Sequence, residues 1–196
     1  MGVTPTAVSD RIMVTAESTL DSATAEALWE LYQLAFAPLE DRAAGRQFLS
    51  RSDFDSEVLD SRVVKYLARI PIGRIVGLCT LSADLDTVPW ISPSFYRTRY
   101  PAHAARGAVL YCGIALVHPD AQRTRAFPDM LAAMAVDIAG VDGVLVADMC
   151  RYNVDDVPVA RTVDVVMNRV WGSAQQVELD RQLYLAWEPT PRAPVS

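Results

Sequence analysis

Two nearly continuous apolar runs, separated by a helix-like segment, constrain the fold more than any other feature of the sequence. The first run, AVLYCGIALV at 108–117, and the second, GVLVADMC at 143–150, have the length of buried strands. Between them, apolar residues recur at helical spacing over 130–138, after Pro128 at a first helical position and before Gly140. A strand–helix–strand unit of this length predicts two parallel strands in one sheet.

The segments on either side of this unit predict further strands and helices. In chain order we expect a strand at 11–16, a helix at 22–37, one or two short helices within 42–60, strands at 62–69 and 74–81 joined by a turn at 70–73, and a long connection at 84–106. After the unit we expect a helix opened by 155–158 and stopped by Gly172, then one or two closing strands within 175–188, as a hairpin turning near Asp180.

This order predicts a single α/β domain over residues 10–188. The sheet is expected to be mixed and mostly antiparallel, with helices on both faces and a βαβ unit after the fourth strand. A chain of 196 residues fits one domain that buries roughly 70% of its unfolded surface. The two ends, residues 1–9 and 189–196, are expected to be flexible.

The charge of the chain argues against two classes of partner. Its formal net charge is −6 at pH 7, whereas nucleic acids and anionic membranes require a concentrated basic face. The first thirty residues lack a basic start followed by an apolar run, and the apolar run at 107–117 is too short to span a bilayer as a helix. We therefore expect a cytoplasmic protein. Three cysteines without a close-spaced pair and two histidines predict neither a disulfide framework nor a metal site.

The long connection at 84–106 combines three prolines with several aromatic residues. Loops of this length inside a compact domain are often lids or binding elements. The alternative is that its aromatic residues only seal one end of the sheet. As a binding element it would contact the apolar part of a ligand and hold a carboxylate or phosphate, through Trp90, Phe95, Tyr96, Arg97 and Arg99.

The residues that leave the first apolar run are Val117-His118-Pro119-Asp120-Ala121-Gln122. In this stretch, and in the order of its elements over 11–188, the chain resembles the GNAT acetyltransferase superfamily. In that family a strand ending in Val is followed by a loop of the form Gln/Arg-x-x-Gly-x-Gly/Ala, at which a helix begins. The resemblance implies a GNAT-like fold, an acyl-CoA co-substrate and transfer of its acyl group to an amine.

The loop of this chain departs from the family pattern at both glycine positions, which hold Arg125 and Phe127. The ring of Phe127 is expected to occupy the room for phosphate, and Pro128 lacks an N–H group, whereas Arg123 and Arg125 bring guanidinium groups that pair with phosphate. Three alternatives stay open: CoA held by arginine side chains, a pantetheine on an acyl carrier protein, or no donor. The resemblance implies donor contacts at Ala115, Leu116, Val117, Gln122, Arg123, Thr124, Arg125, Ala126, Phe127 and Asn153.

Acyl transfer to an amine needs a base for the amine and a proton for the departing thiolate. Where some family members carry a base, this chain has Tyr111, a phenol that is a poor base unless its pKa is lowered, or else a packed aromatic residue. The family's acid position holds Asn168, which does not titrate. Asp148 interrupts an apolar run and either faces the cleft or pairs with an arginine. Cys112 suggests a covalent acyl-cysteine or a small core residue.

We therefore expect a GNAT-like acyltransferase that acts on an amine of a small molecule or peptide. The alternative is a GNAT-fold protein without transferase activity, which serves as a binding or assembly module or performs another reaction in specialised metabolism. A homodimer is compatible with either function, although the sequence specifies no interface. The transferase hypothesis requires a gap between the two parallel strands, one ending at Val117 and the other at Cys150.

Overall fold

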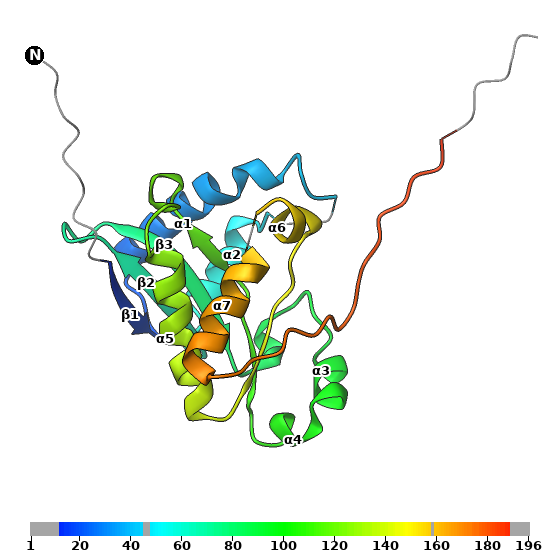
Figure 1. Cartoon of the computed structure of the whole chain (residues 1–196). Coiled ribbons are helices and arrows are strands. Elements are labelled where there is room, and N and C mark those ends of the chain that lie inside the picture. The colour runs from blue at the N-terminus through cyan, green and yellow to red at the C-terminus, as the bar shows by residue number, and fades with distance from the viewer. Residues whose placement is uncertain (1–11, 45–47, 158, 189–196) are drawn as a thin grey trace, which may run out of the picture.

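The structure is a computed structural model that describes residues 12–44, 48–157 and 159–188 (Figure 1). The segments at 1–9 and 189–196, which we expected to be flexible, lie outside the described residues. The elements in chain order are β1 (Met13–Glu17), α1 (Ser22–Phe36), the 3-10 turn η1 (Ala37–Leu39), α2 (Arg51–Val58), β2 (Val63–Arg69), β3 (Ile75–Ser82), the 3-10 turn η2 (Leu85–Thr87), α3 (Pro93–Arg99), α4 (Pro101–Ala104), β4 (Val109–Tyr111), β5 (Ala115–Val117), the 3-10 turn η3 (Pro119–Ala121), α5 (Ala126–Gly140), β6 (Val144–Val146), α6 (Arg151–Asp155) and α7 (Val159–Trp171).

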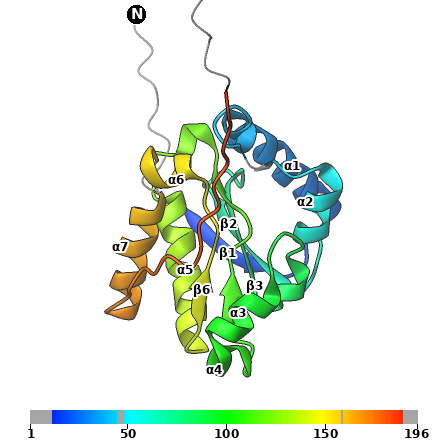
Figure 2. The same ribbon diagram turned by 90° about the vertical axis from the view of Figure 1, so that its right-hand side faces the viewer.

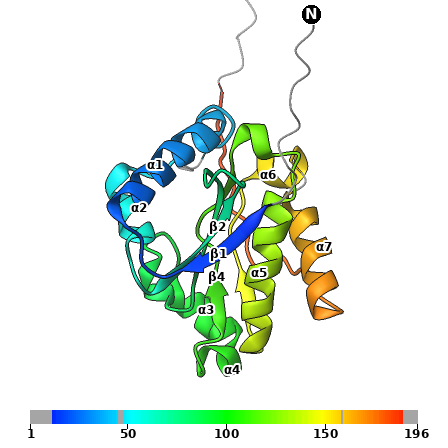
Figure 3. The same cartoon turned by 90° about the vertical axis from the view of Figure 1, so that its left-hand side faces the viewer.

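The strands form one mixed, mostly antiparallel sheet, as the sequence predicts. The order is β1-β2-β3-β4-β6, and β5 pairs with β3 beside this path. The β4–β6 pair is parallel, and α5 connects its two strands, so the predicted βαβ unit is present. Helices α1 and α2 cover one face of the sheet, and α5 and α7 lie on the other (Figure 2, Figure 3). The predicted fold class is therefore confirmed.

Two apolar clusters fix these helices to the sheet. On one face, Leu28 and Leu31 of α1 and Phe54 of α2 are buried against Leu67 and Leu78 of the sheet. On the other face, buried residues of α5 pack against β2 and β3, among them Met130, Met134 and Ile138. The helical spacing read from the sequence thus places one apolar stripe of α1 and of α5 on the sheet, whereas α7 packs its apolar stripe against α5.

The closing hairpin expected within 175–188 is absent. In the described part of the chain, residues 173–188 form no helix and pair with no strand. The segment runs as an extended chain whose large apolar residues are exposed, including Leu183 and Trp187. An alternating pattern predicts a segment with one apolar face that must be covered. The pattern does not identify the strand that covers this face.

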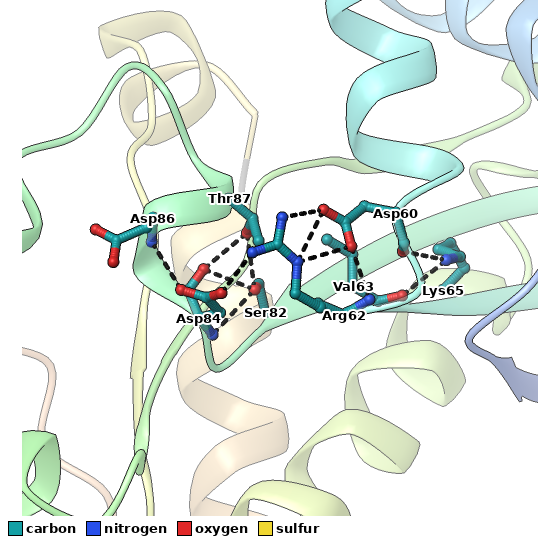
Figure 4. A network of polar contacts seen from close by, with 8 residues as sticks. All are labelled: Asp60, Arg62, Val63, Lys65, Ser82, Asp84, Asp86 and Thr87. Atoms are coloured by element: carbon teal, nitrogen blue, oxygen red, sulfur yellow. Dashed lines mark hydrogen bonds and ion pairs between the residues drawn. The ribbon is translucent and has the colours of Figure 1, made fainter.

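Lys65, the single lysine of the sequence, is fully buried on β2. Its Nζ donates hydrogen bonds to three backbone carbonyl oxygens, at 2.6 Å to Ser18, 2.9 Å to Asp60 and 2.7 Å to Val63. These carbonyls belong to the segment after β1, the segment after α2 and the start of β2. Figure 4 shows the hydrogen bonds to Asp60 and Val63. One ammonium group therefore holds three chain segments together.

The same region anchors the start of the long connection. Arg62 bonds to the carboxylates of Asp60, at 2.6 Å, and Asp84, at 2.7 Å (Figure 4). The backbone carbonyl of Asp84 accepts hydrogen bonds from the hydroxyls of Ser82 and Thr87. Since the connection begins at residue 84, this network attaches it to β2 and β3 before it crosses the end of the sheet.

We predict that Lys65→Met lowers the free energy of unfolding by about 2–4 kcal/mol, because one buried and two partly buried carbonyl oxygens lose their shared donor. Denaturant unfolding monitored by circular dichroism measures the change. Arg74→Met removes a positive charge from an exposed position and is expected to shift stability by less than about 0.5 kcal/mol. Equal stabilities of the Lys65→Met variant and the parent chain would show that the ammonium group is not required.

Candidate functional site

The two parallel strands of the βαβ unit separate after residue 112. Their last ladder bond is the one from the Cys112 N–H to the Val146 carbonyl, at 2.9 Å. Beyond it, β5 pairs only with β3, and in the described residues no strand pairing joins 115–117 to 147–150. The apolar run 108–117 is thus two short strands with an irregular stretch at 112–114 between them. The gap that the transferase hypothesis requires is present.

The free edge of β5 presents backbone groups towards this gap. The Ile114 carbonyl accepts from Thr80 N, and His118 N donates to the Val76 carbonyl, so residues 114 and 118 face β3. Since backbone groups alternate in direction along a strand, Leu116 also faces β3, while Ala115 and Val117 face away from it. Two of the three strand residues implied as donor contacts therefore offer free backbone groups to an extended ligand.

Glu57 of α2 reaches into the irregular stretch. Its side chain is buried, and its Oε1 accepts a hydrogen bond from the hydroxyl of Thr80. That hydroxyl in turn accepts the Ile114 N–H at 2.8 Å. A Cβ on Gly113 would lie 2.3 Å from Oε1, so only glycine leaves room for the carboxyl group there. Glu57 Oε2 is buried without a hydrogen-bond partner among the described residues.

Burial, together with the negative charge of Asp148, raises the pKa of Glu57 to about 7. The hydrogen bond from Thr80 and the charge of Lys65 oppose this shift. A carboxyl group that titrates near neutral pH is well matched to general-base catalysis, because it is partly ionised and still a useful proton acceptor. No motif in the sequence points to Glu57.

Tyr111 and Asp148 face each other across the separating strands. The Tyr111 hydroxyl donates to Asp148 Oδ1 and accepts from Trp90 Nε1 at 3.3 Å. Burial, followed by the charge of Asp148, raises the pKa of Tyr111 well above its ordinary value. The phenol therefore stays protonated, which opposes its expected role as a base. Asp148 is exposed and lies just beyond β6, and among the described residues it pairs with this tyrosine instead of an arginine.

Cys112 is an unfavourable nucleophile in this position. The thiol is buried, and burial raises its pKa to about 12, with further contributions from the charges of Glu57 and Asp148. Since the thiolate is the reactive form, a thiol in this environment is inert at neutral pH. The structure favours the alternative in which Cys112 is a small core residue.

The aromatic residues of the long connection differ in their burial. Tyr96 packs against the buried cluster at the end of the sheet, with its ring centroid 6.1 Å from that of Tyr111. Trp90 and Phe95 each remain 40% exposed, so their faces are available to a ligand. Arg97 is bonded to Asp86 at 2.9 Å. Arg99 borders a shallow surface hollow with Ser94, Phe95 and Thr98.

The loop that precedes α5 is open at its surface. Residues 122–125 are exposed, and the Thr124 hydroxyl accepts the Ala126 N–H at 3.2 Å. Phe127, expected to fill the phosphate position, instead packs into the clusters between α5, the sheet and α7. Its ring is placed there because the first turn of α5 directs it towards the core, so it does not obstruct the loop. Arg125 forms an ion pair with Asp129 at 2.8 Å.

A basic groove continues from this loop between α5 and α7. It has a volume of about 620 Å³, and Arg125, Arg161 and Arg169 lie along it. The rest of its lining is apolar apart from Thr162, and consists of Pro128, Ala132, Val165, Val166 and Val170. Arg161 and Arg169 of α7 were not among the residues predicted for the site. Their spacing of eight residues puts them on one face of a helix, and this spacing could have indicated a basic stripe on α7.

The two asparagines occupy different environments. Asn168 accepts the Ala174 N–H at 2.9 Å and donates to the Asp164 carbonyl at 2.9 Å, so it holds the end of α7. Asn153 lies inside the short helix α6, where Cys150 is the N-cap residue.

The described residues contain no group of three or more histidine, cysteine or acidic side chains that could hold a metal ion. None of the helices in the described ranges is long and apolar enough to cross a membrane.

No protein-family model matches the sequence, and no curated protein matches it. Solved structures do resemble the fold. One is the aminoglycoside acetyltransferase meta-AAC0020 from an uncultured soil metagenomic sample, in complex with trehalose, with a TM-score of 0.51 and 11% identity over 90% of this chain and 99% of that chain. Another is AAC(6')-Iy in complex with the bisubstrate analogue CoA-S-monomethyl-acetylneamine, with a TM-score of 0.51 and 12% identity over 91% of this chain and 99% of that chain. At these identities the likeness shows the fold, and it supports the expected GNAT-like architecture.

Replacing Glu57 with Gln is expected to change how stability depends on pH. A raised pKa in the folded state means that the folded chain binds the proton more tightly, so the parent chain loses stability as pH rises from about 4.5 to about 7. Relative to the parent, the Glu57→Gln variant should gain on the order of 3 kcal/mol across this window. Denaturant unfolding at pH 4, 6 and 8 measures the difference. Ser56→Gln, on the exposed side of the same helix, should show a constant difference.

Gly113→Ala tests the close approach of the carboxyl group. The added methyl group must displace Glu57 from Thr80, and we expect a loss of about 1–3 kcal/mol in the free energy of unfolding. Gly140→Ala is the matched control, because a Cβ there meets nothing within 4 Å and the residue ends α5, so it should be neutral or slightly stabilising. If both variants are equally stable, Glu57 is not seated against Gly113.

Proposed function

We propose that this chain is an N-acyltransferase that moves an acyl group from a thioester to an amine of a small molecule or peptide. The observation that carries the proposal is the buried carboxyl group of Glu57, which has one oxygen unpartnered in the described residues and lies where two parallel strands separate. A thioester arm along the free edge of β5 would bring its carbonyl to residues 112–114, beside that carboxyl group. A base is thus available at the place where an amine would attack.

The donor is proposed to be acyl-CoA or a pantetheine thioester on an acyl carrier protein. Both carry an arm of amide groups that suits the free backbone groups of Ala115 and Val117. Both also carry phosphate, and the exposed loop with Arg123 and Arg125 leads into the groove that contains Arg161 and Arg169. Guanidinium groups pair with phosphate oxygens in bidentate fashion. The cytoplasm, where such thioesters are formed, is the proposed location.

The proposed reaction assigns one step to each polar side chain of the site. The exposed carboxyl group of Asp148 attracts the ammonium form of the acceptor, which releases one proton to water. Ionised Glu57 accepts the second proton, which leaves the nitrogen as the C–N bond forms. The nitrogen lone pair then forms a C–N bond to the thioester carbonyl carbon. When the C–S bond breaks, its electron pair leaves on sulfur, which takes a proton from Glu57 or from water. Tyr111 remains neutral and keeps Asp148 oriented.

A second candidate function is a GNAT-fold module without transferase activity. The observation that favours it is the loop before α5, where glycines are replaced and the Ala126 N–H is already bonded to Thr124. Fewer backbone donors then remain for a pyrophosphate. This second candidate function includes a protein that uses the same site for another reaction, because the fold alone does not determine the chemistry.

Calorimetry with acetyl-CoA, longer acyl-CoAs and pantetheine separates these candidates. Binding of CoA that weakens in the Arg123→Ala/Arg125→Ala variant supports CoA as donor. Binding of pantetheine alone, at an affinity unchanged in that variant, supports a carrier protein. Absence of binding by all of them, together with no thiol release in the presence of a panel of amines, favours the module.

Glu57→Gln is expected to lower kcat/KM by about 10²- to 10⁴-fold, because the amine loses its proton acceptor. The affinity for the donor should stay unchanged, since Glu57 is placed beside the reacting carbonyl and not along the pantetheine arm. In the parent chain kcat/KM should rise with pH through about 7, and this rise should disappear in the variant. Thiol release followed by a chromogenic reagent measures both effects, with Ser56→Gln as the control. A fully active Glu57→Gln variant would eliminate Glu57 as the base.

A further inference from the structure

The outer face of α7 carries two arginines with a valine between them. Arg161, Val165 and Arg169 follow one another at intervals of four residues, so they lie on one face of the helix. At a rise of 1.5 Å per residue, the two arginines lie about 12 Å apart along the helix axis. All three residues are exposed, Val165 to 58%. Since α7 lies at the edge of the molecule, with α5 between it and the sheet, this stripe is open to a partner (Figure 2, Figure 3).

Neither arginine of this stripe has an acidic partner. Within the described ranges Arg161 and Arg169 form no ion pair, whereas Arg125, the third arginine of the groove, is bonded to Asp129. The acidic residue of α7, Asp164, accepts a hydrogen bond from the side chain of Asn168 at 3.1 Å. In a chain with a net charge of −6, two such arginines create a local positive potential that attracts an acidic partner.

The groove beside the stripe combines this charge with an apolar floor. Pro128 and Ala132 of α5 and Val166 and Val170 of α7 line the floor. A small anion would pair with one arginine and leave the floor uncovered. An amphipathic helix with acidic residues at intervals of seven or eight, and apolar residues between them, would pair with both arginines and cover the floor together with Val165. The shape and charge of the groove therefore favour a protein partner.

Arg125 connects this groove to the loop before α5, because it belongs to both. In that loop the Ala126 N–H is bonded to the Thr124 hydroxyl and Pro128 has no N–H, so few backbone donors remain for a pyrophosphate. Arg123 is exposed there and forms no ion pair with another described residue. A phosphopantetheine group on a carrier protein is attached through a single phosphodiester, which one guanidinium group can bind in bidentate fashion. The loop thus suits a donor with one phosphate.

We propose that the groove between α5 and α7 is the docking surface for an acidic amphipathic helix of an acyl carrier protein, which is the donor of the acyl group. This inference rests on the proposed acyl transfer and specifies its donor. The acidic side chains of the partner contact Arg161 and Arg169, its apolar residues cover Val165, and the phosphodiester binds Arg123. Since the loop follows β5 directly, the pantetheine group can then lie along the free backbone groups of 115–117. Charge complementarity of this kind supports a small, transient interface.

An apo carrier protein, which lacks the phosphopantetheine group, tests the docking surface separately from the transfer reaction. Acidic apo carrier proteins of fatty-acid and of polyketide synthesis are titrated onto the full chain by surface plasmon resonance, at low and at high salt. At low salt, Arg161→Glu and Arg169→Glu should each weaken binding by about tenfold, because an attractive contact becomes repulsive. Arg74→Glu, which reverses an exposed arginine in the turn between β2 and β3, is the matched control and should bind as the parent does. Circular dichroism verifies the folding of each variant.

Two results would overturn the docking surface. One is the absence of binding by every carrier protein of the panel, and the other is equal binding by the parent and both groove variants. Variants that lose affinity for acetyl-CoA but keep it for the apo carrier protein would identify the groove as a nucleotide site instead, which also contradicts the proposal.

The same experiment distinguishes the docking surface from the proposed function. Acyl transfer from acetyl-CoA to an amine, in a chain that binds no carrier protein, would support the transferase and refute the docking. Binding of the apo carrier protein that weakens in the groove variants, with no thiol release from its acylated form in the presence of a panel of amines, would support the docking and refute the transferase.

Discussion

The separation of two parallel strands at residues 112–114 is the constraint on which the site depends. Up to Cys112 the backbone is paired on both sides, with β3 and with the strand that contains Val146. Beyond it, β5 keeps its pairing with β3 and loses the partner on the other side. The backbone groups of Ala115 and Val117 that face away from β3 are therefore available to an extended ligand.

Glu57 is tied to the same separation. Its carboxyl group occupies space that exists only because residue 113 has no side chain, and the hydroxyl of Thr80 links it to the backbone of Ile114. Taking a carboxyl group out of water destabilises its ionised form, which explains the raised pKa. Burial also raises the pKa values of Tyr111 and Cys112, so both groups remain protonated at neutral pH. In this site Glu57 is the group poised to change its protonation state.

Several features of the fold could be predicted because their causes are local. The apolar runs, the helix between them and the turn at 70–73, where Gly73 has a φ of 83°, depend on residues that are neighbours in the chain. Asp21, a residue type that favours the N-cap, caps α1 through a 2.7 Å hydrogen bond from Thr24 N. The gap between the strands ending at Val117 and Cys150 could be expected from the resemblance. The presence of Glu57 in this gap could not be predicted, because Glu57 and Gly113 are 56 residues apart in the sequence.

The sequence by itself determined the order of the elements, the mixed character of the sheet and the parallel pair, because periodicity and turn chemistry act over a few residues. Only the tertiary structure decided which side chains enter the site. The ring of Phe127 lies in the core between α5 and α7, and Asp148 pairs with Tyr111. It also decided that residues 182–188 stay exposed, since an alternating segment is compatible with any free strand edge. Contacts between distant segments depend on the geometry of the whole sheet, which no local pattern contains.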